Sequence, residues 1–175
     1  ELVQTLSGVN DIDRDPFFMN SVNVNDSLYF LSFEGNLQAI VPEKQKLGLG
    51  KKYDLLRKAK RFMREAKHMR PSGWQVMSAD NSGNIYILLR ENAGPGDHKF
   101  GGQFVLVFNT KKGKISSIMP LDNDGFSIEV TSGATPLLVV TRTDMTIDVY
   151  DLKTQKRLRT IGDFGPSMPI TLHAR

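Results

Sequence analysis

Side chains that commonly perform catalysis or bind metals are sparse in this sequence. There is no cysteine, which excludes disulfides, thiolate zinc sites and cysteine nucleophiles. The three histidines, His68, His98 and His173, are far apart and match no metal-ligand spacing. No nucleophile elbow, phosphate-binding loop or dinucleotide fingerprint is present. The residues therefore predict no catalytic residue, no metal ligand and no cofactor-binding residue in this chain.

Acidic residues gather at two places. "NDIDRD" (10 to 15) loosely resembles a calcium-binding loop, but it lacks the central glycine and closing glutamate of an EF-hand. "LDNDG" (121 to 125) predicts a turn between two strands.

A basic segment dominates the charge distribution. From Lys44 to Arg70 there are eleven Lys or Arg and two acidic residues, whereas the rest of the chain has twelve and seventeen. Apolar residues at three- and four-residue spacings predict one amphipathic helix over 51–70, ended by Pro71, within a helical insertion at 44–71. The predicted apolar stripe comprises Leu55, Leu56, Ala59, Phe62, Met63, Ala66 and Met69.

Four cations of this helix, Arg57, Lys58, Arg61 and Arg64, are candidate partner-binding residues. Their charge suits an acidic protein, nucleic-acid phosphates or an anionic membrane surface; alternatively, the charges are simply solvated. Nucleic acid is not expected as a partner, because the aromatic residues that stack on bases are missing from the basic face. No membrane span is expected either, since no run approaches the ~20 apolar residues that a spanning helix needs.

The rest of the sequence predicts short antiparallel strands joined by hairpin turns. Turn signals lie at Glu34-Gly35-Asn36 within 21–41, at Lys111-Lys112-Gly113 within 103–119, and near Thr143-Asp144 and Thr154-Gln155 within 136–161. "VFNTKKGKISSI" (107 to 118) and "VYDLKTQKRLRTI" (149 to 161) share one pattern at an offset of 42 or 43 residues. A period of ~40–45 residues with about four strands is typical of β-propeller blades. We therefore expect an all-β chain, a partial β-propeller domain over 1–175 with about three to four blades.

Several segments together resemble one family, the heavy (β) subunits of the quinoprotein amine dehydrogenases, especially methylamine dehydrogenase and its aromatic-amine relative. The resemblance rests on "LYFLSFEGNLQAI", "RPSGWQ", "NIYILL", "HKFGGQFVLVFNTKKGKISSI", "PLLVVTRTDMTIDVYDLKTQKRLRTI" and "GDFGPSMPI". It runs through nearly the whole chain and corresponds to the C-terminal half of that subunit.

The resemblance implies a seven-bladed propeller subunit of a periplasmic heterotetramer. Two heavy subunits assemble there with two disulfide-rich light subunits, which carry the tryptophan tryptophylquinone cofactor and the catalytic base. The complex oxidises a primary amine to an aldehyde and ammonia, then passes electrons to a small copper protein or a cytochrome. The heavy subunit is mainly scaffold and docking surface. This chain is therefore expected to be non-catalytic and to hold no cofactor of its own.

The only tryptophan, Trp74, is the most diagnostic residue of the resemblance. We expect it to begin the first strand of a blade, over 74–77, and to pack between blades or near the light-subunit face. The strongly basic insertion departs from the family pattern, so the partner surface is expected to differ. An alternative of another class is a propeller interaction module without enzymatic activity, which binds an acidic partner through the basic helix. A hydrolase or lyase with its site on the propeller axis is a third possibility.

Overall fold

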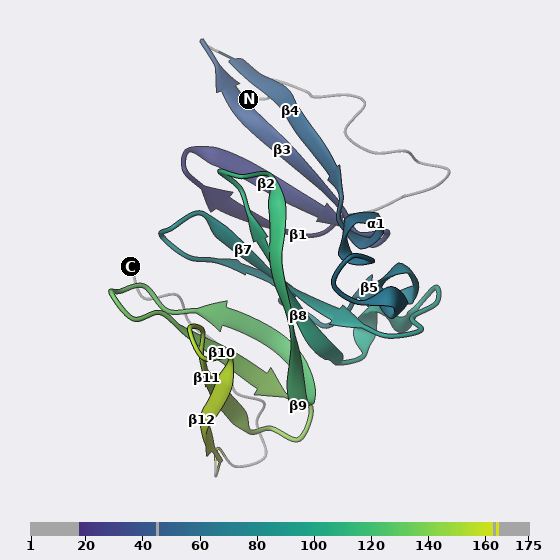
Figure 1. Ribbon diagram of the computed structural model, residues 1–175, viewed down its shortest axis with the longest axis vertical. Helices are drawn as coiled ribbons and strands as arrows, with labels where there is room; N and C mark the ends of the chain where they lie inside the picture. Colours follow the sequence, from purple (N-terminus) through teal and green to yellow (C-terminus); the bar gives the residue numbers. More distant parts are fainter. Residues whose placement is uncertain (1–17, 45, 163, 165–175) are drawn as a thin grey trace.

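The computed structural model describes residues 18–44, 46–162 and 164, and these residues form three consecutive antiparallel blades (Figure 1). The acidic cluster at 10–15, His173 and most of "GDFGPSMPI" lie outside the described residues. The prediction of an all-β partial propeller is confirmed by these sheets.

The first blade contains β1 (Phe18–Val24), β2 (Ser27–Ser32), β3 (Asn36–Glu43) and β4 (Lys46–Asp54), paired in that order. The predicted turn at Glu34-Gly35-Asn36 joins β2 to β3. Residues 21–41 were predicted as two strands but contribute to three, because a tight turn separates β1 from β2. Asn25 and Asp26 both have positive φ there (48° and 60°), a conformation that Asn and Asp tolerate in hairpin turns.

The second and third blades share one long strand. The second blade contains β6 (Met77–Ala79), β7 (Asn84–Arg90), β8 (Gly102–Asn109) and the first half of β9 (Lys114–Val130). The short β5 (Arg70–Pro71) pairs with the end of β7. The second half of β9 then opens the third blade, followed by β10 (Leu137–Arg142), β11 (Ile147–Asp151) and β12 (Lys156–Ile161).

The segment 121–125 is part of β9, which corrects the predicted inter-strand turn. Gly125 pairs with Gly102 of β8 and also with Arg142 of β10. β9 is therefore hydrogen-bonded to a neighbouring strand throughout the passage from the second blade to the third. The Asp124 carboxylate accepts hydrogen bonds from Arg90 and from Gln103. Polar residues that resembled a turn signal therefore mark an irregular crossing between two blades, stabilised by partners distant in sequence.

The blades meet at their innermost strands. Gln75 and Ser127 form a parallel bridge between the chain just before β6 and the second half of β9. The Trp74 N–H donates to the Phe126 carbonyl (2.8 Å), and the Val130 N–H donates to the Ser78 hydroxyl (2.9 Å). The first strand of the second blade is Met77–Ala79, slightly later than the predicted 74–77. Parallel innermost strands around one axis are the arrangement of a propeller, although three blades are fewer than the about four to eight that close a ring.

The basic insertion is mostly not helical, which corrects the predicted helix over 51–70. Residues 51–54 extend β4, where the side chain of Tyr53 is buried. α1 (Leu55–Ala59) and η1, a 3₁₀ helix (Arg64–His68), are the only helical pieces of the insertion among its described residues. Asp54 fixes the start of α1, because its carboxylate accepts a hydrogen bond from the Arg57 backbone N–H (3.0 Å).

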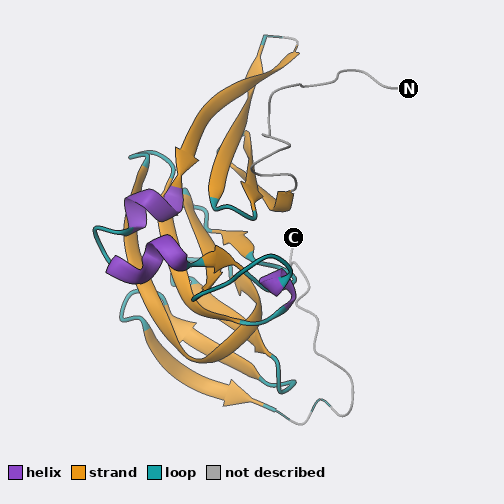
Figure 2. Ribbon diagram, turned by 90° about the vertical axis from the view of Figure 1, so that its right-hand side faces the viewer, coloured by secondary structure: helices purple, strands orange, loops and turns teal. Residues whose placement is uncertain are grey.

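Most of the predicted apolar stripe is nevertheless buried. Leu55, Ala59, Ala66 and Met69 all pack into the core, since α1 and η1 lie side by side (Figure 2) and α1 contacts both β3 of the first blade and β9 of the second. Phe62 is the exception and is 51% exposed. The helix ends before Phe62, so this side chain does not follow the direction that a continuous helix would give it.

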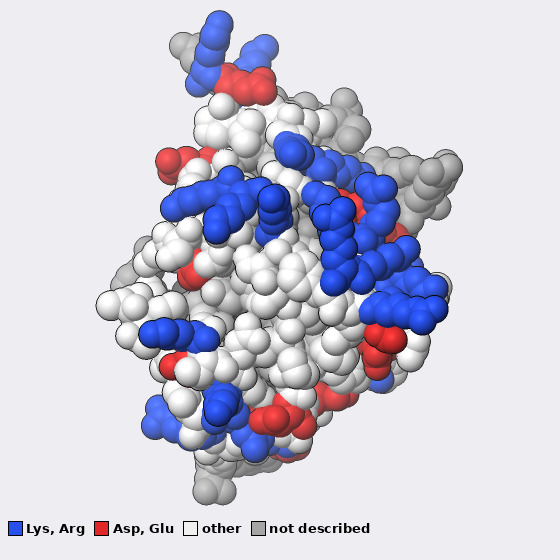
Figure 3. Space-filling model, viewed as in Figure 1, with Lys and Arg blue, Asp and Glu red and all other residues white. Residues whose placement is uncertain are grey.

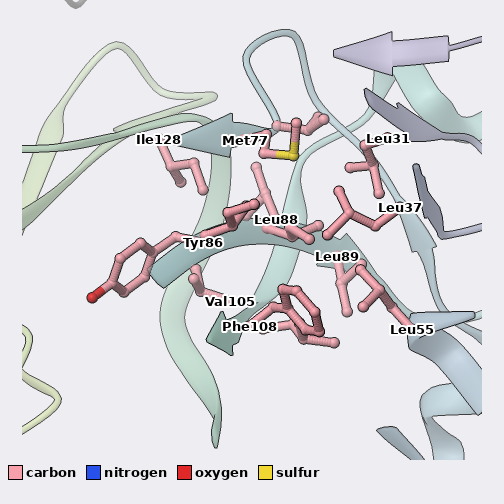
Figure 4. Packing of buried hydrophobic residues seen from close by; sticks show 14 of the residues in the cluster. Leu31, Leu37, Leu55, Met77, Tyr86, Leu88, Leu89, Val105, Phe108 and Ile128 are labelled. Carbon is pink, nitrogen blue, oxygen red and sulfur yellow. The ribbon is translucent and has the colours of Figure 1, made fainter. Parts of the chain in front are cut away.

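One continuous core joins the first blade, the insertion and the second blade (Figure 4). Leu31 and Leu37 of the first blade and Leu55 of α1 belong to the same cluster as Leu89 and Phe108 of the second blade. β7 is buried along almost its whole length, as expected for a central strand covered on both faces. The cluster continues into the third blade, so the blades are held together by side-chain packing as well as by their inner strands.

Gly73 offers a direct test of the inner-strand junction. It has φ +125°, and a Cβ there would lie 2.5 Å from the Phe126 carbonyl oxygen. We expect Gly73→Ala to lower the free energy of unfolding by roughly 3 kcal/mol, from backbone strain and the steric clash together. Gly96 is a matched control, since it also has positive φ (+91°) but open space around it. Gly96→Ala should cost only about 1 kcal/mol in chemical denaturation of the purified native complex, and equal losses for the two variants would contradict the junction.

The 175-residue chain should not be stable when it is expressed alone. No described strand pairs with the outer edges of β1, β4 or β12, and apolar side chains are exposed there, with Leu158 of β12 57% exposed and Leu47 of β4 48% exposed. We expect aggregation or a broad, poorly cooperative thermal transition in circular dichroism. A sharp, reversible two-state melt of the isolated monomer would show that three blades are self-sufficient.

Candidate functional site

The strongest candidate site is a groove between α1 and the β8–β9 turn, which we call the basic groove. It has a volume of about 670 Å³. Its lining residues are Lys51, Arg57, Lys58, Arg61, Phe62, Lys112, Gly113, Lys114 and Ile115. Six of these nine residues carry a positive charge, and none of the described residues that line the groove is acidic. Figure 3 shows Lys and Arg gathered over the part of the surface where α1, β4 and the β8–β9 hairpin lie in the same view of Figure 1.

The buried ring of Tyr53 does not line the basic groove but lies close to residues of both its sides. The ammonium groups of Lys51 and Lys58 lie 5.4 Å and 4.9 Å from the centre of its ring, at cation–π distance. The ring packs edge-on against Phe108 of β8, with 4.7 Å between ring centres. A single buried ring thus anchors two like charges and ties β4 to the second blade.

The β8–β9 turn approaches the same ring from the other side. Gly113 has φ +61°, and a Cβ at this position would lie 3.3 Å from Cε1 of Tyr53. The Lys112 N–H donates to the Asn109 side chain (2.9 Å), which stabilises the turn. Glycine is required for this close approach, and the approach places Lys112 and Lys114 opposite α1.

The α1 side of the groove contributes Arg57, Lys58 and Arg61. Arg57 is paired with Asp54 (Nε–Oδ2 3.3 Å), but both side chains are largely exposed, so this pair adds little stability. The exposed ring of Phe62 completes this side. The groove therefore combines several cations with a single accessible aromatic ring.

The structure brings together three of the five predicted site residues. Arg57, Lys58 and Arg61 line the basic groove, whereas Arg64 begins η1, is exposed and does not line it. Sequence reasoning missed Lys51, Lys112, Lys114 and Phe62. Lys112 had been recognised only as a turn residue, and nothing in the local sequence indicates that this turn lies opposite residues about 50 positions earlier. Whether the candidates bind a partner stays a prediction.

Trp74 lies at a second surface, formed by the innermost strands, which we call the inner-strand surface. A groove of about 600 Å³ there is lined by Asn20, Ser21, Val22, Asn23, Trp74, Gln75, Met77, Ser78, Ala79 and Glu129. Trp74 contacts Phe126 of the neighbouring blade, with ring centres 5.2 Å apart, yet it is 71% exposed. The prediction that Trp74 packs between blades is thus wrong for most of the indole, although one blade-to-blade contact exists. Its expected place near a light subunit stays a prediction.

A hydrogen bond between blades orders the polar part of the inner-strand surface. The Gln75 amide donates to Glu129 (2.6 Å) and also to the Ile128 carbonyl (3.2 Å). These bonds hold Gln75 and Glu129 in fixed positions across the junction. They make the surface a preformed face rather than a flexible loop.

The described residues contain no group of three or more His, Asp or Glu positioned to hold a metal ion. Within the same part of the chain, no helix is long and apolar enough to cross a membrane. His98 lies in η2 (Asp97–Lys99), a short 3₁₀ helix between β7 and β8, where its ring packs edge-on against Phe33 (5.9 Å) and its carbonyl accepts the Gly73 N–H (2.9 Å). Its contacts are those of a structural residue.

Comparison with known sequences gives a family match over nearly the whole chain. The family described as "Methylamine dehydrogenase heavy chain (MADH)" matches residues 12–174. A curated relative, the methylamine dehydrogenase heavy chain of Paracoccus versutus, is 30% identical over 101 residues. That alignment covers 57% of this chain and 24% of the relative, so the match spans about a quarter of the longer protein.

Comparison with solved structures gives propellers of another kind. The WD40 repeats of RRP9 match with a TM-score of 0.53 at 11% identity, covering 85% of this chain and 39% of that one. The structure of U3-55K matches with a TM-score of 0.51 at 8% identity, covering 85% and 40%. At these identities the similarity concerns the fold alone, and it confirms the propeller architecture.

The crowding of cations in the basic groove should be measurable in stability. We expect Lys112→Glu to raise the thermal midpoint of the purified native complex by about 2 °C at low salt, because it relieves repulsion by the surrounding lysines and arginines. The gain should largely vanish in roughly 0.5 M NaCl, where exposed charges are screened. Lys153 is a matched control on the equivalent β11–β12 turn, where a lysine lies beside Asp151. If Lys153→Glu stabilises the protein as much as Lys112→Glu does, the groove has no special concentration of charge.

Proposed function

The chain belongs to the methylamine dehydrogenase heavy chain family, and from this premise we propose that it is a non-catalytic propeller scaffold of an amine dehydrogenase. In this proposal the complex oxidises a primary amine to an aldehyde and ammonia in the periplasm. It then passes electrons to a small copper protein or a cytochrome. The assembly contains a second heavy subunit and two light subunits. The observation that carries the proposal is the family match over residues 12–174.

The proposal assigns the tryptophan tryptophylquinone to the partner light subunit. Forming this group requires two joined tryptophan side chains, whereas the 175 residues contain only Trp74. The ring that packs against Trp74 is that of Phe126, a phenylalanine that cannot supply the second indole. The residues present therefore do not fit the quinone, and no step of amine oxidation is assigned to them.

The contribution of this chain is a rigid surface. The bonds from Gln75 to Glu129 and from Val130 to Ser78 join neighbouring blades, so they hold the inner-strand surface in one shape. Trp74 presents a large apolar ring at the edge of this polar surface, and such aromatic residues are enriched at the centre of protein interfaces. We assign the light-subunit contact to the inner-strand surface, where the exposed indole would be covered.

Native mass spectrometry of the purified complex tests this assignment. We expect a small second subunit whose intact mass shows the cross-link of a tryptophan-derived quinone, together with two copies of the heavy subunit. The same preparation should reduce a redox dye when a primary amine is added and should not do so without the amine. A complex that lacks a cross-linked quinone subunit, and reduces no dye with any primary amine, would contradict the proposed function.

A further inference from the structure

We propose that the basic groove is a docking site for an acidic segment of a partner protein, with an apolar side chain of that segment seated against Phe62. The groove lies on the outer part of the blades and shares no residue with the inner-strand surface. The inference therefore goes beyond the scaffold function and does not depend on amine oxidation.

Four arginines outside the basic groove form ion pairs with acidic side chains, whereas most cations of the groove form none with a described residue. Arg70 pairs with Glu34 (2.9 Å), Arg90 with Asp124 (3.3 Å) and Arg142 with Asp144 (2.6 Å). Arg157 pairs with Asp122 (3.2 Å) in the third blade. Among the described residues, Arg57 is the one groove cation in an ion pair, and its partner Asp54 does not line the groove. The groove thus concentrates positive charge that an incoming anion would neutralise.

The arrangement of the lysines favours an anionic ligand over plain solvation. The ammonium groups of Lys51 and Lys58 both lie near the Tyr53 ring, 5.4 Å and 4.9 Å from its centre, so the two charges lie on the same side of the groove. The close approach of Gly113 to the same ring brings Lys112 and Lys114 to the opposite wall. Two walls of like charge, fixed by a buried aromatic ring, form a preorganised anion-binding surface.

The apolar residues of the groove indicate a polypeptide ligand. Phe62 is exposed in the wall, and Ile115 lies buried at the base. A segment that alternates carboxylates with an apolar side chain satisfies both the cations and these apolar contacts. Protein interfaces commonly combine a central aromatic anchor with a charged rim of this kind.

Nucleic acid and membrane fit the groove less well. Single-stranded nucleic acids bind to several aromatic side chains that stack on successive bases, whereas Phe62 is the only accessible aromatic residue among the groove's lining residues. Membrane-binding surfaces present apolar side chains that project beyond their cations into the lipid. Here the cations and Phe62 line a concave groove.

The test uses the purified native complex and a fluorescein-labelled 12-residue peptide of Glu and Asp with one central Leu. Fluorescence anisotropy should show saturable binding that weakens steeply with added salt. The paired charge reversal Lys58→Glu with Lys112→Glu, one from each wall, should raise Kd at least tenfold. The paired reversal Lys153→Glu with Lys156→Glu, on and beside the equivalent turn of the third blade, should leave Kd within twofold.

Further arms separate the kinds of ligand. Phe62→Ser should weaken binding of the Leu-containing peptide about threefold to tenfold, and should not change binding of a peptide with Gly in place of Leu. A single-stranded oligonucleotide and vesicles containing 30% phosphatidylserine, roughly the charge density of an anionic leaflet, should bind more weakly than the peptide. Equal losses from the two charge-reversed pairs, or tighter binding of the oligonucleotide or the vesicles, would overturn the proposal. Amine-dependent dye reduction should be the same in the three variant complexes as in the wild-type complex, so a failure of the docking site is distinguishable from a failure of the proposed enzyme function.

Discussion

A short row of hydrogen bonds at the inner edge of the blades fixes the second and third blades relative to each other, and the first blade packs against this pair. The N–H groups of Trp74, Ile128 and Val130 donate across the junction between the second and third blades, to Phe126, Gln75 and Ser78 respectively. Backbone groups buried at such a junction are costly to leave unpaired, so the two strands are held at one spacing and in one register. The chain enters this row at Gly73, which has positive φ. Glycine is needed at this position, because a side chain there would clash with the Phe126 carbonyl.

The inner row positions the second and third blades, and side-chain packing against the second blade then positions the first. Each blade extends outward from its first strand, and the long β9 carries the chain from the outer edge of the second blade to the inner edge of the third. Because the first and second blades pack against each other through Leu31, Leu89 and Phe108, Tyr53 reaches Phe108. That contact brings the insertion and the β8–β9 turn together and creates the basic groove. The chain thus presents two separate surfaces, an inner one with an exposed indole and an outer one with a cluster of cations.

The sequence predicted those features that depend on local patterns. Turns at Gly35, Gly113 and Thr143-Asp144 are where the glycines and polar residues indicated, and the repeat at an offset of 42 or 43 residues corresponds to the outer hairpins of neighbouring blades. The predicted helix over 51–70 was wrong in its first turn, because the sequence around Tyr53 is compatible with a strand as well as with a helix. Pairing of β4 with β3 stabilises the strand there. The Asp54 cap was a local signal for the later start of the helix. Predicting the basic groove would have required knowing which blades are neighbours. No local sequence pattern indicates that Lys112 and Lys114 lie opposite α1.

Disulfide trapping tests the arrangement of the inner strands most directly, because the chain has no cysteine of its own. Gln75 and Ser127 are bridge partners, so cysteines introduced at both positions should have Cα atoms within the roughly 6 Å that a disulfide spans. Mild oxidation of the native complex should then give a faster-migrating heavy subunit on a non-reducing gel. A control pair at Gln75 and Thr131 should not form the bond, since four residues along a strand add about 13 Å. Cross-linking of the control pair, or no cross-linking of Gln75→Cys with Ser127→Cys, would contradict the side-by-side blades on which the account rests.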